Sequence, residues 1–421
     1  MLNRIKIILK DYNLRNKILF VLAVLVLFRI GSSIPIPGVD HIRLSAFLSN
    51  NQFFGLLDIF SGGGLSNLSI LMLGVAPYIT ASIIMQLFTM IFPKLKELYQ
   101  EEGEAGRQKF NQYSRLLTVP LGFLQGFGLM TMLQGQKILG EISFLDKFTN
   151  ISIMIAGTMI LLWLGELISE KGIGNGVSLI IFGGIVAGLP SIIQRTLFTF
   201  DPSQIPMYGL FLAVAVLIIG GVVIISEAER LVPVSYAKQV RGSRMYGGVS
   251  THIPLKVNQA GVIPIIFAIS ILLFPQMIVN LLAGLNSGTV AVLSGYILAF
   301  LNNSLVYGAL YFILVFFFTY FYTAVTFDPK MISQNLQKSG AFVPGIRPGQ
   351  PTSDHLAKII TRITLVGALF LGLIAVLPLG ITAVTGISSL AIGGTALLIV
   401  VSVVLETAKQ IEAQVVMKEY E

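Results

Sequence analysis

The chain has 421 residues, of which 54% are hydrophobic and only 11% are charged. Soluble domains carry about 25% charged residues, so this composition excludes an ordinary soluble protein and indicates a polytopic membrane protein. The absence of cysteine excludes disulfides, iron–sulfur clusters, c-type haem and thiol catalysis, and the net charge of +8 favours anionic lipid, nucleic acid or acidic partners.

Ten apolar runs are long enough to cross a bilayer as helices, which takes about 20 residues. The first follows a basic N-terminal stretch, reaches full spanning length without a cleavage pattern, and is expected to be a retained helix. The runs are 18–34, 71–92, 114–134, 150–169, 175–195, 207–226, 260–282, 304–326, 361–379 and 388–406. Because ten is an even number, both termini are expected on one side of the membrane.

The distribution of basic residues indicates which side that is. Twenty-three of the 28 Lys and Arg residues fall in the termini and in the loops on the terminal side. Cytoplasmic loops carry such an excess, so both termini are expected in the cytoplasm of a cell-membrane protein. Arg29 lies late in the first span, close to the outer surface, and takes no part in this pattern.

The stretch 56–92 combines two unlike segments. The first contains Gly62, Gly63 and Gly64 followed by polar residues, and is too polar to cross a bilayer. The second is a long apolar run interrupted by Pro77. Glycine-rich backbone at membrane depth is tolerated only where protein or a water-filled cavity surrounds it. We therefore predict a transport path here, beside a proline-broken membrane helix.

Two long cytoplasmic loops, about 227–259 and 327–360, mix basic residues with aromatics, Gly and Pro. Such loops either enforce topology or form docking surfaces, and the sequence leaves both readings open. Arg347 stands between Gly345 and Pro348-Gly349, which predicts a rigid turn that positions its charge.

An internal repeat relates the second and seventh spans. The segment that starts at Gly74 shares Gly, Val, Pro, Ile and Ala with the segment that starts at Gly261. Each belongs to the second helix of a five-helix half, so the two copies run in opposite directions. Inverted repeats place their interrupted helices along the transport path near the midplane.

Catalytic or ion-coupling groups are not expected within the spans. Glu166 and Glu406 lie near cytoplasmic ends, and His41, His252 and His355 are far apart in predicted loops. Neither a metal, a cofactor nor enzymatic activity is therefore expected. A secondary transporter of a small solute also fits ten spans with an inverted repeat, but it requires a polar midplane site. A membrane-embedded enzyme requires clustered catalytic side chains.

Several stretches, in order and at the expected spans, resemble the SecY family of bacterial protein-translocation channels. The resemblance covers nearly the whole chain. The matching stretches are FRIGSSIPIPGVD (28–40), DIFSGGGLSNLSILMLGVAPYITASIIMQL (58–87), EEGEAGR (101–107), GIGNGVSLIIFGGIVAGLP (172–190), STHIPLKVNQAGVIPIIFA (250–268), KSGAFVPGIRPG (338–349) and GGTALLIVVSVVLE (393–406).

The resemblance implies an all-α fold of two inverted-topology five-helix halves, 1–195 and 196–421, around a central pore. A plug of about residues 55–70 would close the external funnel. Its central residues would be Asp58, Ile59, Phe60, Ser61, Gly62, Gly63, Gly64 and Leu65. An apolar ring at the constriction would comprise Val75, Ile79, Ile181, Ile185, Ile266 and Ile399. Ile79 and Ile266 are also the isoleucines that the internal repeat aligns.

The resemblance also implies a lateral gate and a set of partners. The gate would lie between the second and third spans on one side and the seventh and eighth on the other, with Thr80 and Gln125 as polar candidates. Docking of the motor ATPase SecA or the ribosome would use Arg230, Lys238, Arg241, Arg244 and Arg347. Signal peptides and secretory polypeptides would be the transported chains. The further partners expected are the subunits SecE and SecG, together with SecDF, YidC and anionic lipids.

Overall fold

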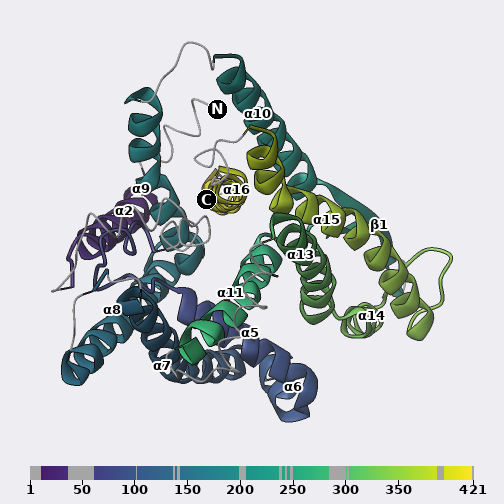
Figure 1. Cartoon of the computed structure of the whole chain (residues 1–421). Helices are drawn as coiled ribbons and strands as arrows, with labels where there is room; N and C mark the ends of the chain where they lie inside the picture. Colours follow the sequence, from purple (N-terminus) through teal and green to yellow (C-terminus); the bar gives the residue numbers. More distant parts are fainter. Residues whose placement is uncertain are drawn as a thin grey trace.

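The computed structural model describes residues 11–36, 61–100, 102–135, 138–139, 143–198, 205–236, 239–241, 244–246, 250–283, 300, 303–385 and 393–419. Within these ranges long helices dominate, and strands gather at one edge (Figure 1). Each of the ten predicted spans coincides with a helix. They are α2 (Tyr12–Ser32), α5 (Ala76–Ile91), α7 (Gly103–Gly135), α8 (Phe144–Lys171), α9 (Gly176–Phe198), α10 (Ile205–Glu227), α11 (Ile263–Ala283), α13 (Ser304–Thr326), α15 (Gln350–Thr385) and α16 (Gly393–Glu419).

Length and hydropathy mark several of these helices as membrane spans. In the part of the chain that the structure describes, four of them are long and apolar enough to cross a bilayer: α7, α8, α13 and α15. The helix α5 continues into the short helix α6 (Pro93–Gln100) through a bend of 116°, and the pair forms a fifth candidate. Three shorter apolar helices lie within α9, α10 and α11.

The prolines of the internal repeat begin helices and do not break them. Pro77 is the second residue of α5, and Pro264 is the second residue of α11. Proline is favourable there because the first turn of a helix leaves its N–H groups without intrahelical partners. Gly74 and Gly261, three residues ahead of each proline, have φ of +55° and +60°. The expectation of a proline-broken helix is therefore wrong: residues 71–75 form turns, and the helix starts after them.

The main apolar core lies where the spans meet in the centre of the bundle. Buried side chains of α2, α5, α8 to α11, α13, α15 and α16 form one cluster there. Within it α11 packs against α5, α7 and α13, and α16 packs against α9, α10 and α15. Side chains on the outside of the spans are apolar and exposed, as a lipid-facing surface requires.

The two long loops, which the sequence predicts to be cytoplasmic, join in one small sheet. Strand β1 (Glu229–Tyr236) pairs antiparallel with β4 (Ser250–Lys256) of its own loop and with β5 (Ala341–Phe342) of the other. A short hairpin, β2 (Gln239–Arg241) and β3 (Arg244–Tyr246), lies between β1 and β4 in sequence. The helix α14 (Pro329–Lys338) and the start of α15 cover the sheet with a separate apolar core. The described residues of both loops thus form one sheet, which the sequence analysis did not predict.

The beginning of α2 and the end of α16 pack together. Leu14 and Val415 are buried in a small apolar cluster with Ile173, which lies in the turn between α8 and α9. Asp11 caps α2 by accepting hydrogen bonds from backbone N–H groups, and it also pairs with Lys418 of α16 at 2.7 Å. The hydrogen bond from Lys418 lowers the pKa of Asp11.

Candidate functional site

The glycine-rich segment begins on the end of α2. In residues 61–75 the backbone forms turns, and the Arg29 guanidinium donates a 2.7 Å hydrogen bond from Nη1 to the Gly62 carbonyl oxygen. The Asn67 amide donates to the Ser32 carbonyl oxygen at 3.3 Å. These two side chains tie the segment to the C-terminal end of α2.

Backbone hydrogen bonds extend this attachment. Residues 34–36, just after α2, form a short antiparallel bridge with residues 68–70. The N–H of Ile36 donates to the Leu68 carbonyl at 2.8 Å, and that of Ile70 donates to the Ile34 carbonyl at 3.1 Å. The segment is therefore docked by backbone hydrogen bonds, which satisfy polar groups that the interior would otherwise leave unpaired.

Gly62 is the tightest point of this contact. Its φ of +67° lies in the left-handed region, which favours glycine. A Cβ there would lie 2.4 Å from the Phe28 ring and 3.2 Å from the Cα of Gly184 in α9. The segment thus fills the space between α2 and α9, and glycine is the residue that fits.

The predicted plug falls only partly within the described residues. Asp58, Ile59 and Phe60 lie outside them. Ser61, Gly62, Gly64 and Leu65 are buried, and Gly63 is half-buried. The end of the predicted plug that lies next to α5 is therefore packed into the protein.

The six residues of the predicted ring all lie in the main apolar core. Val75, Ile181, Ile185 and Ile399 are at most 5% exposed, whereas Ile79 and Ile266 are half-buried against the same cluster. They come from the start of α5, from α9, from α11 and from α16. The structure thus brings residues far apart in sequence into one apolar region. Among the residues that the structure describes, no Asp, Glu, Lys or Arg is buried.

The two polar residues of the predicted gate contact each other. The Gln125 amide of α7 donates to the Thr80 hydroxyl of α5 at 3.3 Å, and that hydroxyl donates to the Ala76 carbonyl at 3.0 Å. Both side chains are half-buried. The helices α5 and α7 also pack against α11, and α11 packs against α13. The four helices expected at the gate are thus contiguous.

Predicted docking residues lie on the sheet formed by β1, β4 and β5 and on the turn that follows it. Arg230 is exposed on β1, and Arg347 is exposed on the turn that follows β5. The turn is ordered: the hydroxyl of Thr352 donates to the Arg347 carbonyl at 2.8 Å, and that of Ser333 donates to the Gly349 carbonyl at 2.6 Å. The prediction of a rigid turn is therefore confirmed.

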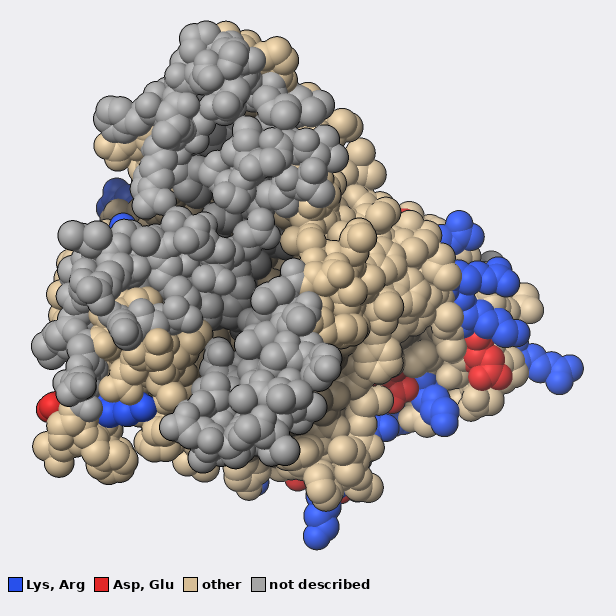
Figure 2. Space-filling model, viewed as in Figure 1, with Lys and Arg blue, Asp and Glu red and all other residues tan. Residues whose placement is uncertain are grey.

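Of the other three docking candidates, Arg241 and Arg244 lie on the hairpin strands β2 and β3, and Lys238 lies outside the described residues. Figure 2 shows Lys and Arg gathered over this edge of the molecule, whereas most of the described surface elsewhere on the face in view is neither basic nor acidic. The exposed basic residues of the sheet, α14 and the start of α15 are Arg230, Lys256, Lys330, Lys338, Arg347, Lys358 and Arg362.

Arg29 makes a contact that the sequence did not predict. It lies exposed in the last turn of α2, where a cation is favourable at a helix C-terminus. Its position was visible in the sequence, but its partner, the Gly62 carbonyl, is 33 residues away, and only the folded chain identifies that partner.

Comparison with known proteins identifies the family. A family model described as SecY matches residues 69–408. The chain belongs to the SecY family. Among curated relatives, the Protein translocase subunit SecY of Corynebacterium glutamicum is 43% identical over 435 residues, covering 98% of this chain and 97% of that protein. The subunit of the same name from Streptomyces galbus is 43% identical over 426 residues, covering 97% and 96%.

Solved structures share the fold. "The structure of a protein conducting channel" has a TM-score of 0.63 at 21% identity, covering 94% of this chain and 91% of that one. "Sec61 in the Canine ribosome-channel complex from the endoplasmic reticulum" has a TM-score of 0.60 at 20% identity, with the same coverage. These likenesses support a ten-helix polytopic membrane fold.

Proposed function

We propose that this chain is the protein-conducting channel subunit of a translocase, in which secretory polypeptides cross the membrane through the centre of the bundle. The observation that supports the proposal is a buried apolar cluster in the centre of the bundle beside a docked glycine-rich segment directly ahead of α5. We propose that part of this cluster is an apolar constriction. An apolar constriction resists water and ions by dewetting and by the cost of removing their hydration shells. A polypeptide can push such side chains apart, because their contacts are many, weak and non-directional.

In this proposal the channel has two closures. Val75, Ile79, Ile181, Ile185, Ile266 and Ile399 form a ring that seals around the transported chain. The segment from about residue 55 to residue 70 is the plug, which Arg29 and the bridge at residues 34–36 hold in place. Displacing the plug therefore breaks these hydrogen bonds and also removes Leu65 and Leu68 from a buried apolar cluster.

The lateral gate lies at the seam of α5 and α7 with α11 and α13. A signal sequence, as an apolar helix, gains about 25 cal/mol for each Å² of apolar surface that it removes from water. Binding at the seam would bias the channel towards the open state, and a few kcal/mol of differential binding is enough for that. The hydrogen bond from Gln125 to Thr80 holds α5 and α7 together as one side of this gate.

The cytoplasmic sheet provides the docking platform. Because β1 pairs with β5, Arg230 and Arg347 lie on one folded unit although they come from different loops. We propose that the motor ATPase SecA and the ribosome bind there; phosphate contacts would suit the basic loops to ribosomal RNA. We also propose four further partners: SecE, SecG, SecDF and YidC. In this proposal both termini lie in the cytoplasm.

A secondary transporter is the competing function, and the described residues do not favour it. It would need a polar or charged site near the midplane. Arg115 and Glu166, which lie in α7 and α8, already pair with each other at 2.6 Å. No group of three His, Cys, Asp or Glu side chains able to hold a metal occurs among the described residues. The family, and the relatives named Protein translocase subunit SecY, indicate a channel and not an enzyme.

Cysteine crosslinking tests the path directly, because the chain has no cysteine of its own. A single cysteine in place of Ile79 should trap a secretory polypeptide stalled during translocation. The matched control is Ile313→Cys on α13, a side chain that is 60% exposed on the outside of the bundle. Equal trapping at both positions, or none at residue 79, would contradict the proposed path.

A further inference from the structure

The short helix α6 leaves the end of α5 at an angle of 116° and does not continue the span. Pro93 explains the break, because proline disfavours helical backbone in the residue before it and is favourable at the start of a helix. Phe92 is accordingly extended, with φ of −109° and ψ of 108°, and its carbonyl oxygen accepts hydrogen bonds from the first turn of α6. None of the predicted site residues lies on α6.

A close backbone contact fixes α6 against α7. A Cβ at Gly106 of α7 would clash with the Leu98 carbonyl oxygen, so the two helices touch there backbone to backbone. The ring centroids of Tyr99 and Phe110 lie 4.8 Å apart, and the Phe110 side chain is buried. Because α6 also follows α5 directly in the chain, it is attached to both helices on one side of the proposed gate.

Tyr99 also reaches the helices on the other side of the gate. Its half-buried side chain packs against the main apolar core. Tyr322 of α13 lies close enough to Tyr99 for the two side chains to interact electrostatically. Tyr322 packs against the same core, and its ring lies edge-to-face with the Phe267 ring of α11, with centroids 6.2 Å apart. A series of aromatic side chains therefore runs from α7 through Tyr99 to α13 and α11.

We propose that Tyr99 is a specificity-determining residue of the lateral gate, which closes the end of the seam beside Tyr322 and sets how apolar a signal sequence must be to open it. The inference rests on the proposed function, because it requires that α5 and α7 separate from α11 and α13. Tyr99 leaves with α5 and α7 when they separate, since α6 is attached to both. A signal sequence must therefore offset the loss of the Tyr99 contact.

The buried hydroxyl groups at the same ends of α7 and α13 do not oppose this separation. Ser114 and Thr118 of α7 each donate a hydrogen bond to a carbonyl oxygen of α7 itself. Thr319 and Thr323 of α13 do the same within α13. Such bonds persist when the helices move apart, so separation leaves none of these four donors unpaired. The apolar and aromatic contacts, with Tyr99 among them, are what separation removes.

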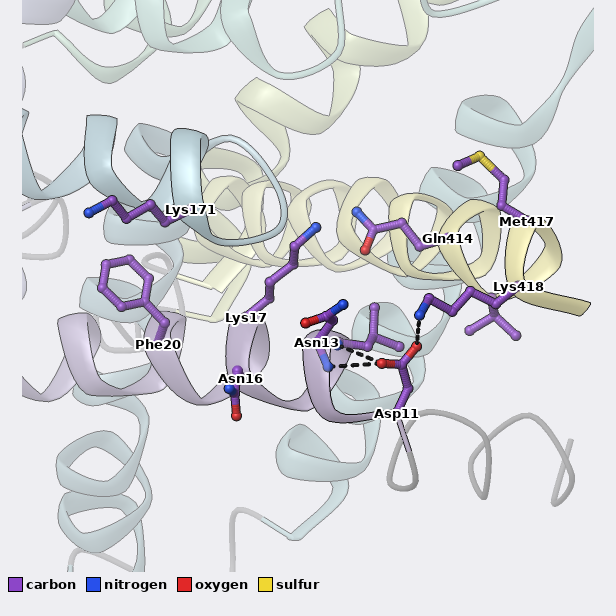
Figure 3. A pocket seen from close by; sticks show the side chains of 11 residues that line it. Asp11, Asn13, Asn16, Lys17, Phe20, Lys171, Gln414, Met417 and Lys418 are labelled. Atoms are coloured by element: carbon purple, nitrogen blue, oxygen red, sulfur yellow. Dashed lines mark hydrogen bonds and ion pairs between the residues drawn. The ribbon is translucent and has the colours of Figure 1, made fainter. Parts of the chain in front are cut away.

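A second contact joins the N-terminal and C-terminal halves of the chain without using the gate helices. Asp11, at the start of α2, pairs with Lys418 of α16 at 2.7 Å (Figure 3). The two helices also share a small apolar cluster there. A bond at this position links the two halves but does not cross the seam, so it provides a matched control.

Cysteine pairs test the inference, because the chain has no cysteine of its own. The full chain, purified with the subunits that accompany it and placed in vesicles, carries either Tyr99→Cys with Tyr322→Cys or Asp11→Cys with Lys418→Cys. Each pair is treated with a short bismaleimide, and a monofunctional maleimide controls for added bulk. We expect both pairs to crosslink in the resting channel. The crosslink across the seam should block SecA-driven translocation, and the crosslink between α2 and α16 should not.

The two possible failures are distinguishable. Absence of SecA-driven translocation by the wild type would contradict the proposed function, whereas the crosslinking yield of the resting channel tests the contact by itself. Failure of residues 99 and 322 to crosslink would overturn the inference, and so would normal translocation by the crosslinked pair. Equal inhibition by the two crosslinks would also overturn it, because any bond between the halves would then be enough.

Truncation of Tyr99 gives a second measurement that does not depend on the placement of cysteines. Tyr99→Ala should raise export of a substrate with a crippled signal sequence roughly 2- to 12-fold, the factor by which one aromatic contact stabilises the closed state. Tyr99→Phe retains the ring and should behave as the wild type, as should Tyr113→Ala at an exposed position of α7. Unchanged export by Tyr99→Ala, or an equal increase with Tyr113→Ala, would refute the role of Tyr99.

Discussion

Gly62→Ala is the sharpest perturbation of the proposed plug. The new methyl group meets the Phe28 ring at 2.4 Å and the backbone of Gly184 at 3.2 Å, so the segment must shift away from α2 and α9. Overpacking of this kind costs about 1–3 kcal/mol. The strain arises only while the segment is docked, so it shifts the equilibrium towards the undocked state. The ratio of undocked to docked segment should therefore rise roughly 5- to 150-fold.

A second glycine provides the control. Gly103 has φ of +65°, close to the +67° of Gly62, but a Cβ at Gly103 has nothing within 4 Å. Alanine therefore incurs the same left-handed backbone strain at both positions, about 1–2 kcal/mol, and clashes only at residue 62. The comparison isolates the loss of plug docking from a general loss of stability.

The assay is anion efflux from vesicles that contain the purified channel, together with export of a substrate with a crippled signal sequence. Gly62→Ala should increase both, while Gly103→Ala should leave both at the wild-type level. Equal efflux from the two variants would refute the inference that the Gly62 contact holds the channel closed.

Three further predictions concern the ring, the platform and the terminal ion pair. Ile399→Asn buries an unpaired amide at a cost of about 1–3 kcal/mol, so it should destabilise the closed channel and let substrates with defective signal sequences pass. Val404→Asn, at an exposed position of the same helix, should not have this effect. If Ile399→Asn exported such substrates only at background level, Ile399 would not belong to the ring. Arg347→Glu should impair SecA-driven translocation in vesicles without loss of folded protein, whereas Lys330→Glu on α14 should leave translocation unchanged. Normal translocation by Arg347→Glu would show that Arg347 has no docking role. The pKa of Asp11 is lowered from 3.8, so its contribution to stability is present above that pH and is lost as the pH falls through the lowered value. The wild type should therefore unfold at a higher temperature than Asp11→Asn at pH 7, and this difference in unfolding temperature should shrink below pH 3.8. A difference that stayed constant with pH would show that the ionisation of Asp11 does not stabilise the fold.

Asparagine is the appropriate replacement for Asp11 because it also caps helices well. The comparison thus removes the charge that pairs with Lys418 and retains the cap on α2.

The sequence by itself determined the ten spans, because hydropathy over about 20 residues is a local property that bilayer thickness fixes. It also predicted the rigid turn at Arg347, because proline fixes φ and glycine allows the left-handed backbone conformations that tight turns need. The sequence wrongly predicted that Pro77 interrupts a helix. The apolar run extends on both sides of Pro77, so only the backbone shows that the helix starts just before this residue.

The tertiary structure decided which of these residues meet. The Arg29–Gly62 hydrogen bond, the pairing of β1 with β5 and the Asp11–Lys418 ion pair all join residues far apart in the chain. No local pattern encodes such contacts, because they depend on how the helices pack. The glycine at position 62 is a clear case: the sequence indicates a flexible position, and only the nearby Phe28 ring and Gly184 backbone show that it is a tightly filled one.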